Sequence, residues 1–84
     1  MSQKYTEEQM DIIIGAAEAA SGVDTAASRL EWASTRIMYG WTENPKTRDR
    51  RETLRRQIVE LMLQLDRLGG EIRQLEHDAR EGKA

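Results

Sequence analysis

Residues 54–79 read LRRQIVELMLQLDRLGGEIRQLEHDA, and this stretch decides the fold. A leucine recurs every seven residues along it, and a second apolar residue follows four positions after each leucine. Alternating spacings of three and four residues predict a long helix that packs through one narrow apolar seam. The seam consists of Leu54, Ile58, Leu61, Leu65, Leu68, Ile72 and Leu75, and it continues to Ala79.

The start of this helix is marked by Asn44 and Pro45, a capping residue followed by a proline in the first turn. We therefore expect a helix over about 45–80. Gly69 and Gly70 lie inside it, where each costs about 1 kcal/mol relative to alanine. They indicate either a turn that opens a fourth short helix at Glu71 or a continuous helix. The heptad phase passes through both glycines unshifted, which favours the continuous helix.

The N-terminal half carries its own start and stop signals. Thr6 and Gln9 form a capping box, and Gly22 is a candidate stop. Asp24 is a candidate cap for a second helix, with Gly40 beyond its end. The sequence thus predicts helices over about 6–21 and 24–39, paired as an N-terminal helical hairpin. With no period-two strand pattern, residues 1–84 are expected to form a single all-α domain.

The leucine seam is expected to face a second copy of the chain. A seam of about 37 Å is longer than the two N-terminal helices, each about 22–24 Å. An antiparallel dimer would place Arg50 opposite Asp78 and Arg55 opposite Glu76, whereas a parallel dimer would pair like charges. The expected assembly is therefore an antiparallel, coiled-coil-like homodimer. The alternative is a monomeric three- or four-helix bundle, with the seam as its core.

Composition also favours self-association. A lone core in a chain of 84 residues is marginal, and the absence of cysteine excludes disulfides and thiolate metal sites. The most apolar stretch, residues 12–20, is short and contains Glu18, so no membrane span is expected. The N-terminus lacks the basic-then-apolar order of a signal peptide, which predicts a cytoplasmic protein.

Catalytic chemistry is not expected. The one histidine, His77, lies at an exposed position of the heptad, without a second metal ligand or a nucleophile in a recognisable pattern. Paired catalytic carboxylates and a glycine-rich phosphate loop are also missing from the sequence. We therefore expect a protein that is not an enzyme and that has no metal or cofactor.

A partner-binding surface is predicted opposite the apolar stripe of residues 24–39. Trp, Tyr and Arg are enriched in binding hot spots, and all three types recur here at seven-residue spacing. They would select an acidic or aromatic protein partner if exposed. The alternative is that the aromatic side chains cover the long helix or the dimer mate. The candidate residues are Arg29, Trp32, Arg36, Tyr39 and Trp41.

A basic cluster opens the long helix and supports an alternative function, a dimeric nucleic-acid-binding regulator. With 15 acidic and 13 basic residues, the net charge of −2 argues against binding by bulk charge. Two acids, Asp49 and Glu52, also dilute the cluster. Its basic members are Lys46, Arg48, Arg50, Arg51, Arg55 and Arg56.

Overall fold

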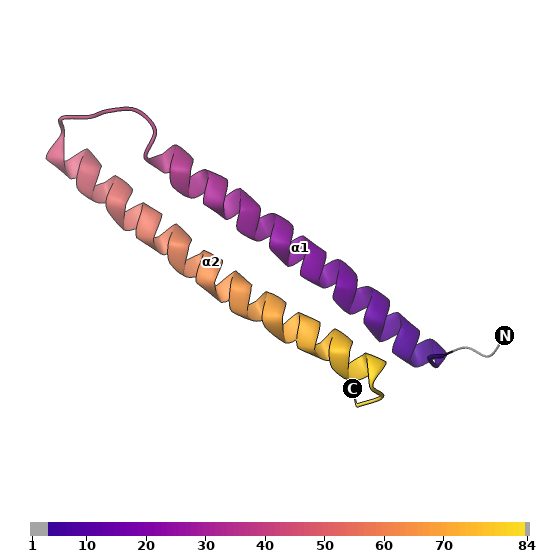
Figure 1. The fold of residues 1–84 in the computed structure, drawn as a ribbon. Helices are drawn as coiled ribbons and strands as arrows, with labels where there is room; N and C mark the ends of the chain where they lie inside the picture. The colour runs from indigo at the N-terminus through magenta and orange to yellow at the C-terminus, as the bar shows by residue number, and fades with distance from the viewer. Residues whose placement is uncertain (1–3, 84) are drawn as a thin grey trace.

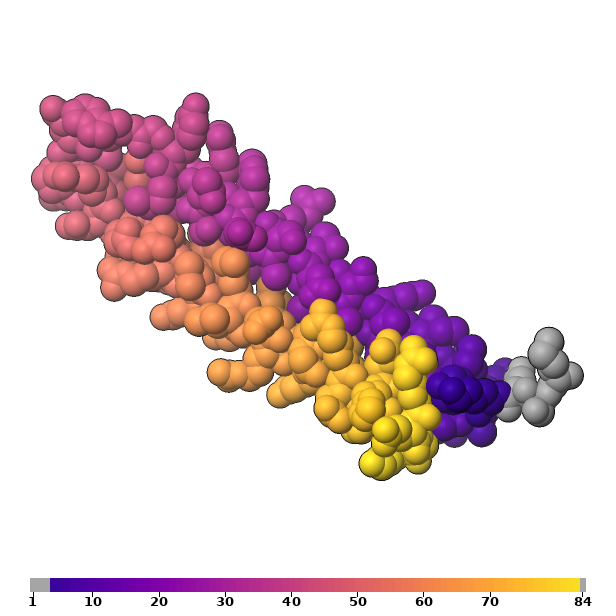
Figure 2. All heavy atoms as spheres, in the orientation of Figure 1, coloured from indigo at the N-terminus to yellow at the C-terminus, as the bar shows by residue number. Residues whose placement is uncertain are grey.

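The computed structural model describes residues 4–83 as two long antiparallel helices (Figure 1). Helix α1 spans Glu7–Ile37 and helix α2 spans Pro45–Arg80, and residues 38–44 join them. The all-α fold is confirmed, and residues 4–83 contain no strand. The hairpin measures 68 × 19 × 11 Å, and its helices lie against each other along their length (Figure 2). Neither helix is long and apolar enough to cross a membrane.

Both helix starts follow from their capping residues. The Thr6 amide donates to Gln9 Oε1 at 2.8 Å, and the Gln9 amide donates to Thr6 Oγ1 at 3.0 Å, which completes the predicted capping box. At α2, Asn44 Oδ1 accepts from the Lys46 amide at 3.0 Å. The predicted helix over 45–80 is confirmed, and it runs through Gly69 and Gly70 without a break.

The predicted division of the N-terminal half into two helices is wrong. Gly22 lies within α1, which continues to Ile37, so residues 6–39 form no hairpin of their own. Gly22 is helical, and positive φ occurs at Gly40 and Gly82 instead. A glycine inside a helix costs about 1 kcal/mol but does not end it when packing continues on both sides. The turn of the chain therefore lies at Gly40, between α1 and α2.

The helices pack through a heptad pattern on each of them. Because the spacings alternate between four and three residues, the contact line stays on one face of each helix. On α1, half-buried or buried residues follow the line Gln9, Ile13, Ala16, Ala20, Val23, Ala27, Leu30, Ser34 and Ile37. On α2 the line is Arg51, Arg55, Ile58, Met62, Leu65, Gly69, Ile72, Glu76 and Ala79.

Small residues at the centre of this seam bring the helices close together. Gly69 is buried, and a Cβ placed on it would lie 3.5 Å from Val23 Cγ1. Near the termini, Gln9 Nε2 donates to the carbonyl oxygen of Ala79 at 3.0 Å. The consequence is a thin core, whose buried hydrophobic members within residues 4–83 are Ile13, Ala16, Ala20 and Ala79.

The two glycines of α2 are expected to respond differently to alanine. Gly70→Ala should raise the free energy of unfolding by about 0.5–1 kcal/mol, because alanine favours the helix and nothing lies within 4 Å of the added Cβ. Gly69→Ala should raise the free energy of unfolding by less, because its added Cβ would lie 3.2 Å from Arg73 Nη1. Urea unfolding followed by circular dichroism, at one protein concentration, measures both. An equal gain at the two positions would contradict close packing at Gly69.

Candidate interaction surfaces

The leucines of the predicted seam are only partly covered. Leu54, Leu61, Leu68 and Leu75 remain 41–49% exposed in the hairpin. Their heptad companions Ile58, Leu65 and Ile72 are half-buried on the α1 side. The structure therefore divides the seven seam residues between the contact with α1 and a line of leucines beside it.

The length of α1 lets it follow the seam from end to end. As one helix of 31 residues, α1 is about 46 Å long and runs beside the full length of the seam, which two shorter helices could not. A second group of apolar residues on α2, off the heptad line of the leucines, is also divided. Met62 is half-buried on the contact line, whereas Val59 and Leu63 are exposed.

An ion pair between α1 and α2 lies on the flank of the hairpin opposite the exposed leucines. Arg73 Nη2 donates to both carboxylate oxygens of Asp24, at 2.8 and 2.7 Å. This contact raises the pKa of Arg73, chiefly through the hydrogen bond to Asp24. At 100° per residue, Leu68 and Leu75 lie about 140–160° around α2 from Arg73. The leucine line therefore lies on the opposite flank.

Helix α1 contributes small residues to the same flank. Ala19 and Ala26 lie about 140–160° around α1 from Asp24, which places them beside the leucine line. Gly15 and Gly22 follow at the outer edge, where an added Cβ would meet nothing within 4 Å. Together these residues form an apolar band along this flank. We call it the leucine–alanine face, defined by Ala19, Ala26, Leu54, Leu61, Leu68 and Leu75.

The predicted aromatic residues are exposed. Trp32, Tyr39 and Trp41 are 66–82% exposed, so they do not form part of the core. The guanidinium carbon of Arg36 lies 4.3 Å from the centre of the Tyr39 ring and 5.8 Å from that of the Trp32 ring. Such cation–π contacts hold Arg36 between the two aromatic rings. We call Arg29, Trp32, Arg36, Tyr39 and Trp41 the aromatic–arginine end.

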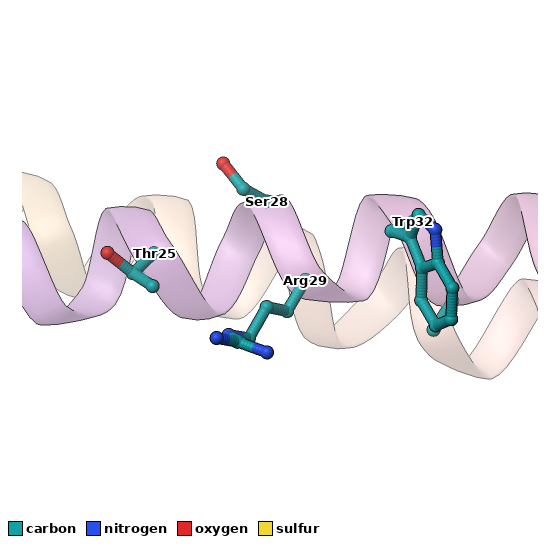
Figure 3. A pocket seen from close by; sticks show the side chains of 5 residues that line it. Thr25, Ser28, Arg29 and Trp32 are labelled. Carbon is teal, nitrogen blue, oxygen red and sulfur yellow. The ribbon is translucent and has the colours of Figure 1, made fainter.

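Two hollows lie within and beside this end. An open groove of about 530 Å³ runs along α1 between Arg29 and Trp32, whose side chains Figure 3 shows with those of Thr25 and Ser28. Trp41 belongs to a smaller hollow of about 190 Å³ by the loop. That hollow is also lined by Met38, Gly40, Thr42, Arg48 and Arg51. The structure thus brings Arg29, Trp32, Arg36 and Tyr39 together and sets Trp41 apart from them.

The basic cluster does not form one face. Arg51 Nη1 donates to the carbonyl oxygen of Gly40 at 2.8 Å, which ties the loop to α2. Arg55 pairs with Glu52, and this hydrogen bond lowers the pKa of Glu52 and raises that of Arg55. Both arginines are half-buried on the contact line. The exposed members of the cluster are Lys46, Arg48, Arg50 and Arg56.

Charge is distributed unevenly along the hairpin. The half nearer the loop, residues 25–65, carries eight basic and five acidic side chains, a net charge of +3. The half nearer the termini, residues 4–24 and 66–83, carries five basic and ten acidic side chains, a net charge of −5. The molecule is therefore a rod with a basic loop end and an acidic terminal end.

The remaining titratable groups do not gather into a site. His77 is exposed, and its Nε2 lies 3.2 Å from Glu81 Oε1. Within residues 4–83, no group of three or more His, Asp or Glu side chains is placed to hold a metal ion. Neither a protein-family model, nor a curated protein, nor a solved structure matches this chain.

Proposed function

We propose that the protein is a non-enzymatic, homodimeric protein-binding module. The observation that carries the proposal is the leucine line, four side chains at heptad spacing that are each nearly half exposed. Removing the rest of each leucine from water would contribute about 1 kcal/mol, or roughly 8 kcal/mol over two copies. Association entropy offsets part of this gain, so the dimer is expected to depend on concentration.

The aromatic–arginine end is the surface proposed for a second protein. Tryptophan and tyrosine contribute large contact areas with few rotatable bonds. Together with arginine, they dominate binding hot spots. Arg36 is held between two rings, so less conformational entropy is lost when a partner binds. Because Arg29 and Arg36 supply the charge, the preferred partner is acidic or aromatic at its contact surface.

Sedimentation equilibrium over a wide concentration range is the first test of the proposal. A dimer that dissociates on dilution would support self-association, and a monomer at all concentrations would exclude it. For the second surface, proteins retained from a cell lysate by the immobilised wild-type protein are identified and then purified.

Trp32→Ala is expected to weaken binding of such a purified partner by at least about 30-fold, because a hot-spot residue contributes 2 kcal/mol or more. Calorimetric titration measures this affinity. Trp32 is 66% exposed, so the melting temperature should remain within a few degrees of wild type. The control is Leu63→Ala, an equally exposed position elsewhere on the rod, which should bind normally. If the two variants bound the partner with equal affinity, the aromatic–arginine end would be excluded as the binding surface.

The net positive loop half supports the alternative function, nucleic-acid binding. Fluorescence anisotropy with duplex DNA and single-stranded RNA oligonucleotides tests it across a range of salt concentrations. Affinity that falls steeply with salt, and is lost when Arg48, Arg50 and Arg56 are replaced by alanine, would favour this alternative. If neither oligonucleotide bound at low salt, nucleic-acid binding would be excluded, and the protein-binding module would remain the proposed function.

A further inference from the structure

We infer that two copies associate in opposite directions through their leucine–alanine faces, forming a four-helix bundle with one loop at each extremity. The inference rests on the proposed self-association and adds its geometry. Its consequence is that the two loops, and with them Trp41 of each copy, lie at opposite ends of the rod. The occupant of the leucine–alanine face is thus a second copy of this chain.

The leucine spacing is self-complementary in this arrangement. A two-fold axis that crosses α2 midway between Leu61 and Leu68 places Leu61 opposite Leu68 of the second copy. The same axis places Leu54 opposite Leu75 of the second copy, so all eight leucines meet. On the other half of the face, Ala19 and Ala26 lie level with Arg36 and Arg29 of the second copy, and the small residues of this half leave room for those longer side chains.

Charges along the edge of α2 agree with the same register. The axis sets Arg50 opposite Asp78 of the second copy and Gln57 opposite Glu71, with Gln64 opposite itself. No like charges meet along this edge. At the α1 edge, Arg29 of one copy lies near Arg29 of the second copy. Because Arg29 is exposed, the repulsion between the two guanidinium groups is weak and is screened by salt.

The charge of the whole rod selects the orientation. Two copies in opposite directions bring each loop half, with net charge +3, against a terminal half with net charge −5. Two copies in the same direction would set +3 against +3 and −5 against −5. Long-range attraction and repulsion of this kind decide orientation even where single exposed pairs contribute little.

The available area is close to what a specific dimer needs. The leucine line runs from Leu54 to Leu75, about 32 Å along α2, and the hairpin is 19 Å wide. The resulting footprint is roughly 600 Å² before side-chain relief is counted, near the roughly 800 Å² per partner of standard interfaces. Because Gln64 lies near the axis and the loop is some 20 residues away, the two loops would be about 60 Å apart.

Distance measurements between spin labels test this geometry directly. The chain has no cysteine, so Glu43→Cys in the loop provides one label per copy, and Lys83→Cys labels the other end. Double electron–electron resonance on the Glu43→Cys dimer should give a distance of about 60 Å. An equimolar mixture of Glu43→Cys and Lys83→Cys should add a component below about 30 Å. Circular dichroism and sedimentation confirm that the labelled variants are folded and associated.

Other outcomes separate the inference from the function on which it rests. A distance below about 30 Å in the Glu43→Cys dimer alone would show copies in the same direction, which overturns the inference and leaves self-association intact. An absence of any intermolecular distance, together with a monomer in sedimentation, would overturn both.

Discussion

Leu61→Lys combined with Leu68→Lys is expected to raise the dissociation constant of the dimer at least 100-fold. These two leucines meet across the proposed two-fold axis, so the dimer loses four leucine contacts, about 1 kcal/mol each. Four ammonium groups would replace them at a buried position, where an unpaired charge is costly. Sedimentation equilibrium at matched concentrations measures the change.

The hairpin itself should tolerate the double substitution better than the dimer does. Both positions are 44–49% exposed in the isolated hairpin, so a lysine stem can lie along the seam with its ammonium group in water. Helicity at high protein concentration, followed by circular dichroism, checks this. The matched control is Leu63→Lys, which places the same charge at a position that is 63% exposed and off the leucine line. If Leu63→Lys dissociated the dimer, or if the double variant kept the wild-type dissociation constant, the interface would have to lie on another flank.

Short-range signals were sufficient to predict where α1 and α2 begin. Thr6 with Gln9, and Asn44 with Pro45, act through side chains within three residues of the backbone groups that they satisfy. Such bonds do not depend on where the other helix lies. This is why the start of each helix could be predicted from the sequence before any tertiary contact was known.

The break predicted at Gly22 failed for a reason that the sequence contains. The heptad phase passes through Gly22 unshifted, from Ala20 and Val23 to Ala27, just as it passes through Gly69 and Gly70 in α2. Periodicity was the better guide at all three glycines, because packing along a continuous face outweighs a local cost of about 1 kcal/mol. The local pattern around Asp24 predicted a helix cap, but its carboxylate forms an ion pair with Arg73 on the other helix.

Because α1 is one continuous helix, its heptad phase also determines how much of the candidate surfaces could be predicted from the sequence. Once the contact line includes Leu30 and Ile37, Trp32 and Tyr39 each lie two residues further along α1, about 200° from that line. Their exposure therefore follows from the correct phase of α1. The distribution of seam residues between α1 and the leucine line depends in addition on how the two helices are rotated against each other, which a single heptad pattern does not specify.

Ile13→Ala is expected to lower the free energy of unfolding by about 2–4 kcal/mol, the range for an isoleucine removed from a packed core. Ile13 is the largest of the buried hydrophobic side chains of the hairpin, at 6% exposure. A lone core in a chain of this size seldom supplies more than about 3–5 kcal/mol. A substantial fraction of the variant should therefore be unfolded at room temperature, as measured by urea titration and circular dichroism.

The adjacent residue supplies the control, because Ile14 is 49% exposed. Ile14→Ala loses part of a side chain that is already hydrated and gains helix propensity, so its effect should stay within about 1 kcal/mol of wild type. Both titrations are made at one protein concentration, low enough to keep the hairpin monomeric, so that dimerisation does not add to the measured stability. A larger loss at Ile14 than at Ile13 would mean that α1 is rotated by one residue relative to the contact line. The leucine–alanine face would then be wrongly placed as well, because its α1 residues are defined by the same phase.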